Sequence, residues 1–151
     1  VFSMFPALKN AVFIRYGVMH RNTFIDSPRL LNGDFSLRSN PLIFFGGQIT
    51  GVEGYMESAA SGLMAGINLA RRLKGEETVV LPEDTMIGAL SRYISDEFVK
   101  NFQPMGANFG VLPPLPDKIR DKQERYMQLA NRGMESLKEF AKNNNLGDYN
   151  D

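Results

Sequence analysis

The sequence predicts an α/β fold, and three neighbouring features of the chain predict it. Residues 41–45, Pro-Leu-Ile-Phe-Phe, form an apolar run of strand length. A strand that is apolar throughout is typical of a sheet covered on both faces, so we expect a buried strand in a parallel sheet. Glycines follow at positions 46 and 47, and beyond Gly54 small and apolar residues recur at helical spacing. This order of strand, glycine turn and helix predicts an α/β architecture.

The helix after Gly54 is expected to have a face for close packing. Its small and apolar residues at helical spacing are Ala59, Leu63, Gly66, Ile67 and Ala70. A glycine in a helix costs about 1 kcal/mol relative to alanine, so Gly62 and Gly66 indicate a close approach to a sheet or a ligand. The basic residues at 71, 72 and 74 suit a helix C-terminus, and Gly75 is the predicted stop.

Two further helices are expected in the second half of the chain. The first runs from about Thr85 to Phe102, with Asp84 as its cap, and the second spans about 117–142. The second helix has one apolar stripe, formed by Tyr126, Ala130, Met134, Leu137 and Ala141. Its other face alternates basic and acidic residues, which is the pattern of a solvated surface. The loop between the two helices contains the Pro-Pro-Leu-Pro stretch at 113–116.

Composition limits the class of protein. The 151 residues suffice for one ordinary domain, and 43% hydrophobic with 23% charged residues is typical of a soluble globular protein. Lys plus Arg equal Asp plus Glu at 17 each, so net charge does not indicate a nucleic-acid binder. The chain has no cysteine and one histidine, which argues against a disulfide, a thiolate nucleophile or a metal site. No apolar run approaches the roughly 20 residues that cross a bilayer, so we expect no membrane contact.

The strongest local motif is the glycine-rich stretch 44–55, FFGGQITGVEGY. Glycines permit positive φ and let a ligand approach the backbone, and the following helix start offers free N–H groups. These residues fit a nucleotide- or flavin-contacting turn and fit equally a tight strand-to-helix connection without a ligand. The stretch lacks G-x-G-x-x-G spacing, so it is not expected to be a primary pyrophosphate loop.

Three phrases of the sequence resemble one family. Residues 44–71, FFGGQITGVEGYMESAASGLMAGINLAR, resemble the flavin-contacting segment of the folate- and FAD-dependent tRNA (uracil-5-)-methyltransferases, the TrmFO or Gid family. RYGVMHRNTFIDSPRLL at 15–31 and KNFQPMGANFGVLPPL at 100–115 resemble further phrases of that family, in the same order. The GidA-type wobble-uridine modification flavoproteins share the GQI…G…GY…EAA skeleton without the other two phrases and rank second. A non-enzymatic module that binds RNA or a partner protein is the alternative from another class.

The resemblance implies the C-terminal part of a glutathione-reductase-like FAD-binding fold with a helical C-terminal segment. Residues 1–45 would return from an inserted domain, 46–75 would form the flavin-contacting turn and helix, and 76–151 the helical region. The residues expected to contact FAD are Gly47, Gln48, Ile49, Thr50, Gly51 and Tyr55. The alternative roles are a hydrogen bond to its own loop for Gln48 and a core aromatic for Tyr55.

A local basic excess lies between Arg15 and Arg38, with Tyr16 and Phe24 interleaved. Arginine binds phosphate and aromatic rings stack on bases, so this segment suits RNA, and it also suits the glutamate tail of folate. The candidate contacts are Arg15, His20 and Arg21. The alternative is structural, with the two arginines tying strands and loops together and His20 satisfied inside the protein.

The activity that the resemblance implies is methyl transfer to RNA. The enzyme would take a methylene carbon from methylenetetrahydrofolate, reduce it through FADH₂ with electrons from NAD(P)H, and methylate C5 of the T-loop uridine at tRNA position 54. It would be a cytoplasmic flavoprotein of tRNA processing. Because this chain lacks both G-x-G-x-x-G and cysteine, we expect the primary FAD loop and the catalytic thiols in a missing N-terminal region. The chain itself is therefore expected to hold no catalytic residue and to be inactive alone.

Overall fold

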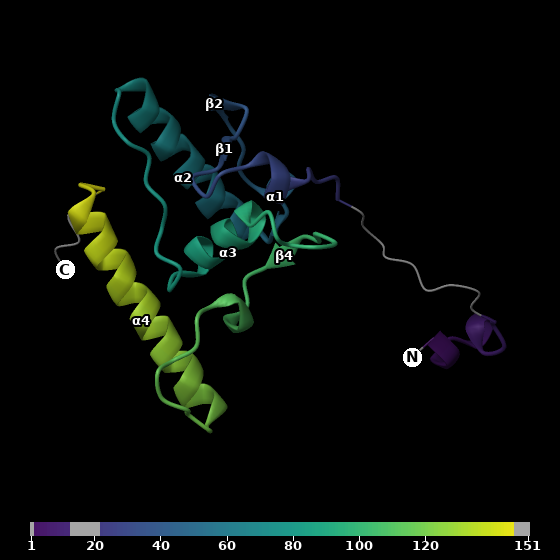
Figure 1. The fold of residues 1–151 in the computed structure, drawn as a ribbon. Coiled ribbons are helices and arrows are strands. Elements are labelled where there is room, and N and C mark those ends of the chain that lie inside the picture. Colours follow the sequence, from purple (N-terminus) through teal and green to yellow (C-terminus); the bar gives the residue numbers. More distant parts are fainter. Residues whose placement is uncertain (1, 13–21, 147–151) are drawn as a thin grey trace.

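The computed structural model describes residues 2–12 and 22–146, and Figure 1 shows the arrangement of its elements. Two 3₁₀ turns near the start, η1 (Phe2–Met4) and η2 (Pro6–Leu8), contact one another. The remaining elements follow in this order: α1 (Ser27–Leu30), β1 (Ser36–Leu37), β2 (Asn40–Phe44), η3 (Gln48–Thr50), β3 (Val52–Glu53), α2 (Tyr55–Leu73), α3 (Met86–Ser95), β4 (Met105–Gly106), η4 (Phe109–Val111) and α4 (Lys122–Asn143). The predicted α/β class is confirmed, with helices and, in the described part of the chain, two small sheets.

The strand predicted at 41–45 forms, but its predicted surroundings are wrong. β2 pairs antiparallel with β1, and the side chains of Leu42 and Ile43 are 59% and 43% exposed. An apolar run sets the tendency to form a strand, whereas burial requires elements that cover both faces. Helix α2 packs on β2, and no second layer covers its outer face within the described residues. The parallel pairing that the described chain does contain joins β3 to β4.

The core gathers apolar side chains from segments far apart in the sequence. Its buried members are Leu31, Phe35, Val52, Met64, Ala65, Leu90, Ile94 and Phe102. The ring of Phe102 packs edge-on against Phe24, with 5.8 Å between ring centroids, and also covers Gly51. A side chain at Gly51 would collide with that ring. The core therefore reaches the underside of the glycine turn and fixes its position.

Helix α2 forms where the sequence predicts it and ends before Gly75, whose φ is +75°. Its inward face includes Asn68, which has no exposed surface. The Asn68 amide donates to the carbonyl oxygens of Asp34 (3.2 Å) and Val79 (2.8 Å), and it accepts from the Val79 N–H (2.8 Å). Asn68 thus ties α2 both to the loop before β1 and to the connection that runs between α2 and α4 toward α3 (Figure 1).

Helix α2 does approach the end of the strand closely, beside Gly62, but the glycine that this contact requires is Gly46 rather than either glycine of the helix. A Cβ added to Gly46, just after β2, would lie 2.7 Å from the Cα of Gly62. Glycine is therefore required at position 46, whereas a Cβ added to Gly62 would itself meet no atom within 4 Å in the described chain. A Cβ added to Gly66 would meet no atom within 4 Å in the described chain, so the second glycine faces open space.

A buried acid reinforces this packing. Asp34 is 6% exposed, and its carboxylate accepts from the Ser36 N–H (2.9 Å) and the Ser36 hydroxyl (2.6 Å). Burial alone raises the pKa of Asp34, but hydrogen bonds from Ser36 and Thr78 and the charge of Arg72 outweigh it, so the pKa is lowered below 3.8. The guanidinium of Arg72 on α2 lies 3.6 Å from the carboxylate. Asp34 therefore joins the β1 loop to α2 in its ionised form.

Helix α3 differs from the prediction at both ends. Thr85 is the N-cap rather than Asp84, because the Thr85 hydroxyl accepts from the Gly88 N–H at 3.1 Å. The helix stops at Ser95 instead of continuing to Phe102, because the Asp96 carboxylate accepts from the Phe98 N–H (3.0 Å) in a local turn. Such side-chain bonds compete with helix continuation.

Asp84, which does not cap α3, pairs with the last helix, α4. Its carboxylate lies 3.2 Å from the Nε of Arg132 on α4. Helix α4 starts at Lys122 rather than 117, since Asp121 caps it by accepting from the Glu124 N–H at 2.8 Å. Its predicted stripe is only partly covered: Ala141 is buried, while Met134 is 55% exposed.

Candidate functional site

The candidate site is the glycine turn that joins β2 to α2. The Gly47 N–H donates to the hydroxyl of Ser61 on α2 at 2.9 Å. Thr50 has no exposed surface, and its N–H and hydroxyl both donate to the Gly47 carbonyl, at 3.0 and 2.7 Å. These bonds make the turn a fixed platform on α2 rather than a loose connection.

Two other segments hold the turn from its sides. The Ile49 carbonyl accepts from the Ile25 N–H at 3.0 Å, before α1. The Gly51 carbonyl accepts from the Met105 N–H at 2.8 Å, at the start of β4. The second contact brings the 100–110 segment against the turn, which sequence reasoning did not place there. Both segments resemble the same family, which was the one hint in the sequence that they act together. The number of residues between them does not tell which residues pair.

Three glycines give the turn its shape. Gly47, Gly51 and Gly54 have φ values of +77°, +86° and +110°. These lie in the region that L side chains rarely adopt, so the turn requires glycine there. The predicted glycine-rich motif is therefore matched by a backbone that only glycine adopts without strain.

The outer side of the turn faces solvent. Gln48 is exposed, Ile49 is 41% exposed, and Tyr55 at the start of α2 is 97% exposed. Among the described residues nothing bonds the Gln48 amide, so its donor and its acceptor are both available. Tyr55 lies outside the core of this chain. The buried Thr50 thus anchors the turn, while Gln48, Ile49 and Tyr55 are presented outward.

The start of α2 already carries its own negative charge. The Glu57 carboxylate folds back over Gly54, and its Oε1 accepts from the Ala107 N–H at 3.0 Å. A carboxylate in the first helical turn complements the positive end of the helix dipole. A second anion is therefore disfavoured at this helix start, whereas a neutral hydrogen-bonding ligand is not.

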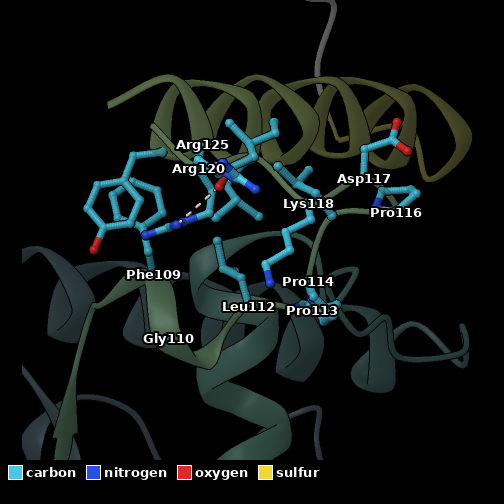
Figure 2. A pocket seen from close by; sticks show the side chains of 14 residues that line it. Phe109, Gly110, Leu112, Pro113, Pro114, Pro116, Asp117, Lys118, Arg120 and Arg125 are labelled. Carbon is cyan, nitrogen blue, oxygen red and sulfur yellow. Dashed lines mark hydrogen bonds between the residues drawn. The ribbon is translucent and has the colours of Figure 1, made fainter. Parts of the chain in front are cut away.

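A separate hollow of about 830 Å³ lies between the 109–120 loop and the first turns of α4 (Figure 2). The ring of Phe109 stacks on that of Tyr126, with 4.3 Å between centroids. Arg132 fixes the loop by donating to the carbonyls of Pro113 (2.6 Å) and Pro114 (3.0 Å). Lys118 and Arg120 line the hollow, are exposed, and form no ion pair with any described residue. The hollow thus combines an aromatic stack with free cations.

Three of the predicted contact residues fall in the segment 13–21. Arg15, His20 and Arg21 lie outside the described residues. Within 2–12 and 22–146, no three His, Cys, Asp or Glu side chains gather as metal ligands would. In the same part of the chain, no helix combines the length and the apolar character needed to span a bilayer.

Comparison with known proteins shows the family to which the chain belongs. Residues 1–77 match the family model described as glucose inhibited division protein A, and the chain belongs to that family. Within it, the chain is similar to proteins named methylenetetrahydrofolate--tRNA-(uracil-5-)-methyltransferase TrmFO. Identity is 56% over 141 residues for the protein of Acetivibrio thermocellus, 57% over 141 residues for that of Streptococcus agalactiae, and 54% over 142 residues for that of Halalkalibacterium halodurans. The resemblance to the TrmFO family stated from the sequence is confirmed.

These alignments are unequal in what they cover. They include 93–94% of this chain but only 32–33% of each relative. The chain therefore spans about a third of the length of the curated relatives it matches.

Proposed function

We propose that this chain is part of a methylenetetrahydrofolate- and FAD-dependent tRNA (uracil-5-)-methyltransferase, and that its glycine turn forms one wall of the flavin site. The observation that carries the proposal is the turn itself. It is fixed from below by Thr50 and Phe102 and presents an unbonded Gln48 amide outward. The names of its relatives supply the reaction, which forms 5-methyluridine in the tRNA. The GidA-type alternative shares the turn, but the relatives compared above bear the TrmFO name.

The residues of the turn fit a neutral part of FAD. Gln48 can donate to and accept from ribityl hydroxyls or the edge of the ring system. The carboxylate of Glu57 at the start of α2 repels a pyrophosphate there, so the phosphates would be held by another part of the protein. Gly47 and Gly51 already bond their N–H and carbonyl groups within the protein, so they would give the flavin close van der Waals contact, while Ile49 and Tyr55 offer exposed side chains. When bound, the flavin supplies the reducing equivalents of the reaction.

The rest of the enzyme lies outside this chain in our proposal. A glutathione-reductase-like FAD fold would be completed by an N-terminal region that carries the pyrophosphate loop and the catalytic cysteine thiols. Methylenetetrahydrofolate and NAD(P)H are the proposed co-substrates, and the cytoplasm is the proposed location. Alone, the 151-residue chain would not methylate RNA.

The tRNA T-arm is the proposed macromolecular substrate. Lys118 and Arg120 beside the hollow of Figure 2 carry free positive charge, which suits phosphate. Arg15, His20 and Arg21 are retained as proposed contacts to RNA or folate on the sequence alone.

The experiment compares Gln48→Ala with Glu124→Ala in the full-length protein. Removing a polar partner from a desolvated contact costs about 1–3 kcal/mol, which weakens FAD binding roughly tenfold to hundredfold. Glu124 is an exposed side chain near the start of α4, where a substitution stays within about 0.5 kcal/mol. The measurements are bound-flavin absorbance and the FAD Kd, with methyl transfer to a T-arm transcript by the parent as the test of the reaction. Equal FAD Kd values in both variants would show that the turn does not hold the flavin. A parent without methyl transfer would refute the reaction.

A further inference from the structure

Helix α2 presents a long apolar stripe outward, on the side away from the core. Its outward stripe is formed by Tyr55, Met56, Ala59, Gly62, Leu63, Gly66, Ala70 and Leu73, all of which are exposed. Tyr55, Met56, Leu63 and Leu73 are 97%, 80%, 65% and 73% exposed, and the stripe contains no charged side chain. The opposite face of α2 is already buried, with Met64 and Ala65 in the core beside Ser61 and Asn68. An outward face of a soluble helix is normally polar, so this stripe is built to be covered.

The stripe continues into an apolar groove of about 510 Å³ between α2, α3 and α4. Leu63 belongs to both the stripe and the groove, and Met134 on α4 forms the opposite wall. The predicted stripe of α4 faces this groove, through Ala130, Met134, Leu137 and Ala141. Stripe and groove are therefore one apolar surface that spans two helices.

We propose that a helix of the same, longer polypeptide covers this surface, crossing α2 at Gly62 and Gly66 and placing an apolar side chain in the groove. The relatives are about three times as long as this chain, so two thirds of such a protein is available to supply it. Gly66 has open space above it, which lets another backbone come close. The absence of charge on the stripe argues against RNA as its partner. The inference depends on the proposed function only in taking the chain as part of a longer protein.

The test compares Leu63→Asp with Met127→Asp in the full-length protein. The two side chains are matched, at 65% and 63% exposed, each in the interior of a long helix. Met127 lines neither the groove nor the hollow at 109–120. If a helix covers the stripe, Leu63→Asp buries a charge and lowers the Tm by about 5 °C or more, while Met127→Asp leaves it nearly unchanged. Equal Tm values for the two variants overturn the proposal.

Gly66→Ala gives a second readout with an opposite sign. In an uncovered helix, replacing glycine with alanine raises the Tm, because alanine is the better helix former. Under a closely packed neighbour the added methyl group lowers the Tm instead, so a rise overturns the proposal. Light scattering after gel filtration tests a second copy as occupant: if Leu63→Asp turns a dimer into a monomer without lowering the Tm, the intramolecular assignment is wrong. If the parent protein shows no methyl transfer, only the proposed function is refuted, because the Tm comparisons do not depend on that activity.

Discussion

Gly46→Ala is expected to disturb the glycine turn from behind, without changing any of the residues that we propose to face the flavin. The added Cβ would lie 2.7 Å from the Cα and 3.1 Å from the N of Gly62, whereas ordinary contact begins at 3.4 Å. Both neighbours are backbone atoms of α2, so no side chain can rotate away. The turn and the helix must separate by about 0.7 Å, the shortfall from ordinary contact.

That separation has two consequences. Overpacking of this kind costs about 1–3 kcal/mol. It also stretches the 2.9 Å bond from the Gly47 N–H to the Ser61 hydroxyl, which fixes the platform under Gln48. We therefore expect Gly46→Ala in the full-length protein to lower the Tm and to raise the FAD Kd by roughly tenfold.

The assay is thermal unfolding together with FAD titration, and Gly33→Ala is the matched control. A Cβ at Gly33 would lie 3.5 Å from a side-chain carbon of Val80, which is ordinary contact, so the effect should stay within about 0.5 kcal/mol. A Gly46→Ala protein with the parent's Tm and FAD Kd would refute the argument that the close approach of Gly46 to α2 positions the turn.

Two further predictions concern charge. Asp34→Asn should destabilise the full-length protein by about 1–3 kcal/mol at neutral pH, since it weakens buried hydrogen bonds and the pair with Arg72. The lowered pKa of Asp34 makes its contribution complete above pH 3.8 and lost as the pH falls through the folded-state value, so parent and variant should converge in acid unfolding curves; a constant difference would contradict this. Lys118→Ala with Arg120→Ala should weaken binding of a T-arm transcript and flatten its salt dependence by about one unit of slope per lost contact. Lys138→Ala, an exposed cation further along α4, is the control, and equal salt slopes would remove the hollow from the RNA site.

The parts of the fold that sequence could predict are those decided within a few residues. Helix α2 and its stop at Gly75 follow from helical spacing and from a glycine that adopts positive φ. The start of α3 did not follow, because Asp84 and Thr85 are both good caps and adjacent. Arg132, which lies 48 residues after Asp84 in the chain, pairs with that carboxylate, and Thr85 caps the helix instead.

Part of the candidate site could likewise be predicted from the sequence and part could not. Positions 47, 51 and 54 could be identified because a sharp turn needs glycine, and the structure gives all three positive φ. The contact of the 100–110 segment with the turn could not be identified, because the pairing of β3 with β4 joins residues about 53 positions apart. Local pattern carries no information on such a register when each strand is two residues long.

The misjudged burial of β2 has the same origin as the exposed stripe of α2. An apolar pattern states that a surface is suited to burial, but it does not state which segment buries it. Leu42 and Ile43 on β2 and Leu63 on α2 are apolar and exposed in a chain that spans about a third of its relatives. The inward face of α2, by contrast, is already buried within the chain: Met64 and Ala65 join the core, and the side chains of Ser61 and Asn68 are hydrogen-bonded. A helix that is apolar on its exposed side as well as in the core is suited to burial on both sides, so the apolar pattern of both elements fits a covering segment, which for α2 is the helix that we propose above.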